Sequence, residues 1–137
     1  MNMAFLKSNI PGIIMSYAET ELLLADAKTR WPEIASSLSN DAHYQKGVEA
    51  AMDLLAQTYK IDEISTAEKT TYWDSNEFPT SENQQLKVIN EQLWVLHLTN
   101  PAEAYSNWRR SGYPELKSAK TYGAITIDAQ EIPRRLP

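Results

Sequence analysis

Cysteine is absent from this 137-residue sequence, which also has only two histidines and four glycines. Without cysteine there are no disulfides, thiolate nucleophiles or thiolate metal sites, although the redox compartment stays undecided because secreted proteins can also lack cysteine. Two histidines are too few for the usual metal centres, so we expect neither a metal nor a cofactor. Phosphate-binding glycine loops and the Gly-x-Ser-x-Gly and His-Glu-x-x-His motifs are also missing. The sequence therefore predicts a protein that is not an enzyme.

Long hydrophobic runs are missing as well. No stretch of about 18 apolar residues occurs, so no segment is predicted to span a membrane. Residues 1–7 lack the basic and apolar regions of a secretory signal, and no cysteine is present to carry a lipid. We therefore expect that the chain as given neither exports nor anchors itself.

Positive charge is scarce over most of the chain. Residues 1–100 hold 7 Lys and Arg against 14 Asp and Glu, whereas residues 101–137 hold 6 against 4, and the net charge is -5. An acidic body disfavours nucleic acid, and the basic residues of the tail are too interspersed to follow a phosphate backbone. This charge distribution is compatible with a neutral, polar ligand.

Apolar residues recur with helical spacing in the first sixty residues. Pro11 suits the first turn of a helix, and the stripe behind it predicts a helix over about residues 12–30. One of residues 39–41 (Ser-Asn-Asp) can cap a second helix that reaches Tyr59. The short connection predicts an antiparallel pair, and Gly47 within the second helix predicts a close approach of two backbones.

A second helical pair follows a less regular segment. Residues 61–79 lose the helical periodicity, so we expect a loop with at most one short helical turn. Residues 81–84 have the form of a capping box before a helix predicted over about 82–98. Asn-Pro at 100–101 then begins a last helix that ends at residue 111.

Together these patterns predict an all-α fold of antiparallel helical hairpins, similar to tetratricopeptide repeats, with a long loop and an irregular C-terminal tail. The unit length suits such repeats, although no repeat consensus is found. Only residues 124–128 look extended. A chain of this length can bury a real core, so residues 1–137 are treated as a single domain.

Tyr72, Trp73 and Asn76 are the candidate ligand-binding residues. Sugar recognition combines flat aromatic faces with amides and carboxylates that bind hydroxyl groups, and residues 72–76 supply both. The alternative, which we prefer, is that the rings fold back onto the core, because large apolar rings in polar loops usually do so.

The other polar candidates are expected to be structural. His43 and His97 are interpreted as packing or exposed residues, and carboxylate pairs such as Glu19 with Glu21 diverge around a helix. Two arginine pairs, at 109–110 and 134–135, suit an anion clamp. We prefer that they tie the last helix and the tail to the acidic first hairpin. Three helical tryptophans are expected to pack in the core: Trp31, Trp94 and Trp108.

Several motifs occur in a fixed order. Residues 17–27 contain Tyr-Ala-Glu and Ala-Asp-Ala, and residues 89–94 read Ile-Asn-Glu-Gln-Leu-Trp. These segments look like the Tyr-Ala-Glu helix and the Ile-x-x-Gln-Lys-Trp motif of the SusD/RagB family, the nutrient-binding lipoproteins of the Bacteroidetes outer membrane. Residues 108–114 (Trp-Arg-Arg-Ser-Gly-Tyr-Pro) and 132–136 (Ile-Pro-Arg-Arg-Leu) look like its closing motifs.

The resemblance implies a role in binding rather than in catalysis. Family members bind glycans or other nutrients at the cell surface and pass them to a TonB-dependent SusC-like porin. They are several times longer, so this chain resembles only their C-terminal helical part, which would be scaffold. Their ligand residues lie largely upstream and vary, so none is carried over.

Two other readings of the sequence remain open. The hairpin pattern would equally suit a stand-alone helical protein-protein interaction module. Scattered carboxylates leave a glycoside hydrolase as a third, weaker alternative. A fragment of a longer helical array is also expected to expose apolar surface and to self-associate.

Overall fold

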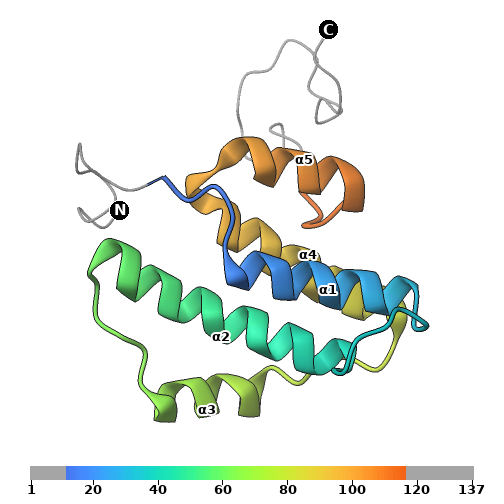
Figure 1. The fold of residues 1–137 in the computed structure, drawn as a ribbon, viewed down its shortest axis with the longest axis horizontal. Helices are drawn as coiled ribbons and strands as arrows, with labels where there is room; N and C mark the ends of the chain where they lie inside the picture. Colours follow the sequence, from blue (N-terminus) through green and yellow to red (C-terminus); the bar gives the residue numbers. More distant parts are fainter. Residues whose placement is uncertain (1–11, 117–137) are drawn as a thin grey trace, which may run out of the picture.

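The computed structural model describes residues 12–116, which form a stack of helices (Figure 1). The elements are α1 (Tyr17–Arg30), α2 (Asn40–Tyr59), α3 (Thr66–Ser75), α4 (Glu82–Leu96), the 3₁₀ helix η2 (His97–Thr99) and α5 (Pro101–Ser111). Within residues 12–116 there is no strand, so the predicted all-α class is confirmed. The extended segment at 124–128 and the predicted C-terminal tail lie outside the described residues.

Helix α1 lies at the centre of the stack. It runs antiparallel to α2 on one side and to α4 on the other, and α5 returns along α4 (Figure 1). Both predicted hairpins, α1–α2 and α4–α5, therefore form, and they meet through α1 and α4. The likeness of these pairs to tetratricopeptide repeats stays a prediction.

The hydrophobic core lies where α1, α2 and α4 meet. Its buried members are Leu22 and Ala25 from α1, Tyr44 and Val48 from α2, and Ile89 and Leu93 from α4. The predicted close approach at Gly47 is confirmed, because a Cβ atom placed there would lie 2.7 Å from Cγ of Leu22. Glycine at this position therefore lets α2 pack directly against α1.

The first helix begins later than the predicted residue 12. Ser16 adopts an extended backbone, and its hydroxyl accepts a hydrogen bond from the Glu19 backbone N–H at 3.1 Å. This cap fixes the start at Tyr17, because it satisfies one of the N–H groups that a helix leaves unpaired at its N-terminus. The start predicted near residue 12 from the apolar spacing is therefore wrong.

The expected loop at 61–79 contains a ten-residue helix, α3, which is a second correction. Ser65 and Glu68 form a full capping box, in which Ser65 Oγ accepts from the Glu68 N–H and Glu68 Oε2 accepts from the Ser65 N–H. Periodicity missed this helix because none of its residues is fully buried. Reciprocal capping stabilises the start of this helix.

The second hairpin agrees with the prediction except at one cap. Asn100 caps α5 by accepting from the Glu103 N–H at 3.5 Å, Pro101 occupies the first turn, and Gly112 ends the helix with a φ of 79°. Ser81 makes no side-chain capping hydrogen bond, so the capping box predicted at 81–84 is wrong. Helix α4 instead depends on burial of its apolar stripe.

Several large apolar side chains are exposed. Trp31 was expected to pack, but it lies at the C-terminal end of α1 and is 53% exposed, whereas Trp108 is buried and Trp94 is half-buried. Ile14, Met15 and Leu98 are exposed by 92%, 72% and 76%. Among the described residues, no helix combines the length and hydropathy needed to cross a bilayer.

Candidate functional site

Tyr72, Trp73 and Asn76 lie together on α3 and its C-terminal end. Tyr72 and Trp73 are half-buried and pack against the core, with their ring centroids 5.0 Å apart and the Trp73 ring 6.0 Å from that of Tyr44. Gln92 Nε2 donates to the Tyr72 hydroxyl at 3.1 Å, and Trp73 Nε1 donates to Glu49 Oε1 at 2.9 Å. Asn76 is exposed and donates to the Tyr72 carbonyl at 2.8 Å. The two rings face the core, and a ligand-binding role for these residues stays a prediction.

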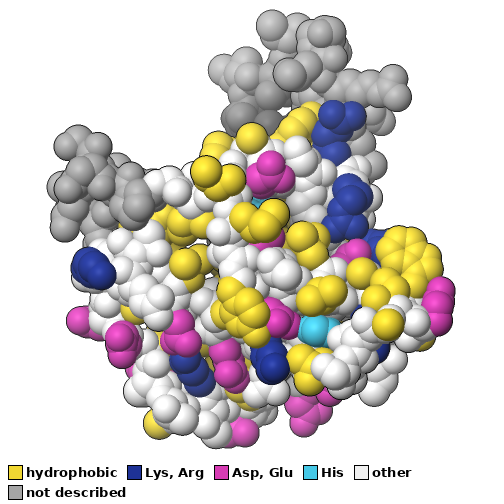
Figure 2. All heavy atoms as spheres, viewed as in Figure 1, with side chains coloured by type: hydrophobic (Ala, Val, Ile, Leu, Met, Phe, Trp, Pro, Cys, Tyr) yellow, Lys and Arg dark blue, Asp and Glu magenta, His cyan; other side chains and the backbone are white. Residues whose placement is uncertain are grey.

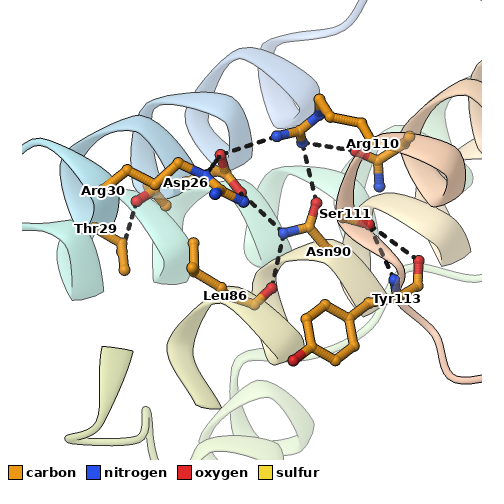
Figure 3. Close-up of polar contacts among 10 residues, drawn as sticks. Asp26, Thr29, Arg30, Leu86, Asn90, Arg110, Ser111 and Tyr113 are labelled. Atoms are coloured by element: carbon orange, nitrogen blue, oxygen red, sulfur yellow. Dashed lines mark hydrogen bonds and ion pairs between the residues drawn. The ribbon is translucent and has the colours of Figure 1, made fainter. Parts of the chain in front are cut away.

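A cluster of polar side chains joins α1, α4 and α5 (Figure 3). Asp26 of α1, Asn90 of α4 and Arg110 of α5 form what we call the polar junction. Asn90 Nδ2 donates to Asp26 Oδ1 at 2.9 Å, Arg110 donates to Asp26 Oδ2 at 3.2 Å, and Arg110 also donates to Asn90 Oδ1 at 3.1 Å. Each member binds the other two, so the cluster closes on itself.

Asp26 is ionised within this junction although its side chain is buried. Burial would raise its pKa, but hydrogen bonds from Arg30 and Asn90 and the positive charge of Arg110 outweigh that effect and hold the pKa below its ordinary value. A carboxylate so fully paired has little capacity left for a ligand. The polar junction therefore acts as an internal clamp between α1, α4 and α5.

For Arg110, the junction supports the preferred structural interpretation of the arginine pairs. Arg110 ties the last helix to the acidic first hairpin, as preferred from the sequence, because its guanidinium bonds Asp26, Asn90 and Asn107. Arg109 lies over the Tyr105 ring with its Cζ atom 5.8 Å from the ring centroid. The pair at 134–135 lies outside the described residues.

Both histidines are buried next to carboxylates of α1. His43 Nδ1 lies 2.6 Å from Glu21 Oε2, and its Nε2 lies 2.6 Å from Ser36 Oγ. Burial would raise the pKa of Glu21, but hydrogen bonds with His43 and Tyr17 lower it below the ordinary value. His97 Nε2 lies 3.3 Å from Glu19 Oε1 without hydrogen-bond geometry. His43 therefore fastens α1 to α2, whereas His97 lies beside Glu19 without a hydrogen bond.

A groove of about 410 Å³ lies between the start of α1 and one face of α2. Tyr17 forms one wall, and small or apolar residues such as Ala18, Ala50 and Leu54 contribute to its lining. The polar residues along α2 are Lys46, Glu49, Asp53 and Gln57. On the viewed face of the molecule, acidic and basic side chains intermingle along α2 (Figure 2). We call this feature the α1–α2 groove.

A smaller groove of about 240 Å³ lies between α1 and α5. His97 and Asn107 contribute to its lining, and neither the His97 ring nitrogens nor Asn107 Nδ2 has a hydrogen-bond partner among the described residues. No aromatic residue other than His97 lines it. Among residues 12–116, no group of His, Asp and Glu is arranged to hold a metal ion.

Comparison with known proteins places this geometry in a family. A family described as "Starch-binding associating with outer membrane" matches residues 1–137, the whole chain. The chain belongs to this SusD-like family. The resemblance seen in the motifs at 17–27, 89–94 and 108–114 is thereby confirmed.

Two solved structures resemble the SusD-like chain closely. One, named "Bacteroidetes AC2a SusD-like", shares 38% sequence identity with a TM-score of 0.87 and matches 97% of this chain. The other, named a chitin-binding protein, shares 36% identity with a TM-score of 0.70 over 84% of this chain. The matches cover 25% and 23% of those two chains, so this chain spans about a quarter of their length. None of the curated proteins matches it.

The family motifs map onto the polar junction. Asp26 belongs to the Ala-Asp-Ala segment, Asn90 follows Ile89 in the α4 motif, and Arg110 is the second arginine of Trp-Arg-Arg-Ser-Gly-Tyr-Pro. Sequence reasoning did not single out Asn90, which is fully buried. Its signal was a polar residue directly beside the apolar stripe of α4, a position that points to a buried polar network.

Proposed function

We propose that this SusD-like chain is the helical scaffold of a non-catalytic protein that binds glycans or other nutrients. In this proposal the protein acts at the outer membrane, as an outward-facing lipoprotein, and hands its ligand to a TonB-dependent SusC-like porin. The family description names starch and the outer membrane, and one solved relative is named for chitin binding. These names support a carbohydrate as the ligand class.

The scaffold role rests on one observation. Arg110, at the centre of the most specific family motif, is spent on Asp26, Asn90 and Asn107 inside the chain. A residue whose donors bind three internal acceptors holds helices together. These contacts support a scaffold role for the motif residues, which maintain the arrangement of α1, α4 and α5.

Capture without bond cleavage agrees with the chemistry of the described residues. The carboxylates of Glu21 and Asp26 are engaged by His43 and by the polar junction, which leaves neither as a free general acid. The pKa of each is lowered, whereas a general acid at neutral pH needs a raised one. This supports binding over glycoside hydrolysis.

A stand-alone helical interaction module is the second candidate. Exposed apolar side chains support it, since Ile14 and Leu98 are exposed by 92% and 76%. Contiguous exposed apolar surface commonly marks a place where another protein binds. The two functions differ in the partner that they require.

Co-purification from the native cell tests the proposal. The chain, carrying an affinity tag at its natural locus, should fractionate with the outer membrane and co-purify with a TonB-dependent transporter identified by mass spectrometry. A tagged outer-membrane lipoprotein of another family serves as the control. Recovery away from the outer membrane, with no transporter bound, would contradict the proposal and favour the interaction module.

A further inference from the structure

The α1–α2 groove has the size of a ligand site. Its volume of about 410 Å³ falls within the range of roughly 300–1,000 Å³ typical of small-molecule pockets. It belongs neither to the polar junction nor to α3. Small side chains, Ala18 of α1 and Ala50 of α2, contribute to its lining.

One wall of the groove is an aromatic ring that the fold leaves uncovered. Tyr17 is 60% exposed although it is a large ring in the first turn of the central helix. Hydrogen bonding with Glu21 raises the pKa of the Tyr17 hydroxyl group. Glu21 is in turn fixed by buried His43. The exposed ring offers an aromatic face on which a ligand can stack.

The opposite wall is a row of polar side chains on α2. Lys46, Glu49, Asp53 and Gln57 follow one another at intervals of three and four residues, so they share one helix face. From Lys46 to Gln57 the helix rises about 16 Å. The groove is therefore longer than one sugar ring, and its row can serve several hydroxyl groups in succession.

The charges of this row favour a neutral ligand. Asp53 is paired with Lys69, since Asp53 Oδ1 lies 2.6 Å from Lys69 Nζ. The other two charged residues of the row, Lys46 and Glu49, carry opposite charges. Glu49 Oε1 accepts from Trp73 and Gln45, but a carboxylate has further acceptor positions. Carboxylates accept from hydroxyls and amides or ammonium groups donate to them, which is the pairing that a polyhydroxylated ligand needs.

We propose that the α1–α2 groove binds a neutral oligosaccharide, with the Tyr17 ring against the apolar face of one sugar and the α2 row hydrogen-bonded to hydroxyl groups. This rests on the proposed function for the class of ligand, and it adds that the helical part itself contacts the glycan. Trp73, a candidate ligand-binding residue from the sequence, contributes to this groove indirectly, because its hydrogen bond holds Glu49 in position.

Nuclear magnetic resonance of the ¹⁵N-labelled chain tests this subsite. Titration with maltohexaose and with chitohexaose, chosen because starch and chitin name the family and a relative, should shift amide signals of α1 near Tyr17 and of α2 between 46 and 57. Tyr17→Leu should raise the Kd about tenfold, the loss of one aromatic contact worth about 1.4 kcal/mol. Tyr17→Phe keeps the ring and should change the Kd less than threefold by the same reasoning.

Trp31→Leu is the matched control, because Trp31 is a well-exposed aromatic at the C-terminal end of α1 and does not line the groove. It should leave the Kd unchanged. Equal affinity of wild type and Tyr17→Leu, shifts confined to other surfaces, or no shift with either sugar at millimolar concentration would overturn the subsite. Glycan binding that survives Tyr17→Leu would leave the proposed function standing, and failure of transporter co-purification would refute that function independently.

Discussion

Replacing Asp26 with asparagine tests whether the polar junction stabilises the fold. The side chain keeps its size but loses its charge, and one of its oxygens becomes an N–H₂ donor. Asp26 accepts from Arg30 Nε at 2.8 Å, Asn90 Nδ2 at 2.9 Å and Arg110 at 3.2 Å. Whichever way the new amide points, it faces at least one of these donors, and Asn90 and Arg110 cannot both keep their partner.

The size of the effect follows from these contacts. Hydrogen bonds to charged groups contribute about 1.5–3 kcal/mol each, but the Arg30 and Arg110 side chains are 33% and 44% exposed, so solvent weakens their share. We expect Asp26→Asn to lower the free energy of unfolding by about 2–3 kcal/mol. For a chain of this length that lowers Tm by roughly 6–15 °C.

Urea unfolding followed by circular dichroism measures this difference, and Asp53→Asn is the matched control. Asp53 forms an ion pair of 2.6 Å with Lys69, but its side chain is 49% exposed, so the same substitution should cost less than about 0.5 kcal/mol. Equal stability of Asp26→Asn and Asp53→Asn at neutral pH would refute the reasoning.

The contribution of Asp26 to stability should also depend on pH. Because the pKa of Asp26 is lowered in the folded state, this contribution is full above the ordinary aspartate pKa and is lost as pH falls through the lowered pKa.

Three further predictions follow from other contacts. Gly47→Ala should destabilise by about 1–2 kcal/mol despite the better helix propensity of alanine, because the new methyl would lie 2.7 Å from Leu22 Cγ, whereas Gly12→Ala meets no atom within 4 Å and should be neutral; thermal unfolding compares them. Ser65→Ala should cost about 1 kcal/mol and raise amide exchange in α3 alone, since α3 depends on its capping box, and unchanged exchange there would contradict this. Glu21→Gln should reduce the loss of stability on acidification, because the lowered pKa of Glu21 makes its contribution disappear as pH falls, and an acid titration identical to wild type would count against the His43 contact.

The helices that bury a regular apolar stripe were predictable from the sequence. Leu86, Ile89 and Leu93 of α4 are buried at the predicted spacing, and Asn100 and Gly112 bound α5 as expected. Two helix starts that depend on serine caps were missed. Ser16 starts α1 and Ser65 starts α3 through hydrogen bonds between side chain and backbone that leave no trace in hydrophobic periodicity.

Candidate site residues were harder to predict than the fold. Trp73 was considered because it is aromatic, yet its ring packs against Tyr44, while Tyr17, quoted only as part of a motif, keeps its ring in solvent. Local sequence reports the residue type but not which face of a helix the neighbouring helices cover. The tie between Arg110 and the acidic first hairpin was predicted, but its partners Asp26 and Asn90 were not, since Asp26 and Arg110 are 84 residues apart in sequence.

The central claim is that separate residues hold the scaffold and contact the glycan, and one paired measurement on Asp26→Asn and Tyr17→Leu tests it most directly. Unfolding free energy and oligosaccharide affinity are measured for both variants at a temperature where both are folded. The account predicts that Asp26→Asn loses stability but binds maltohexaose or chitohexaose as wild type does, and that Tyr17→Leu keeps its stability but binds about tenfold more weakly. The opposite pattern, with binding lost in folded Asp26→Asn and retained in Tyr17→Leu, would contradict it.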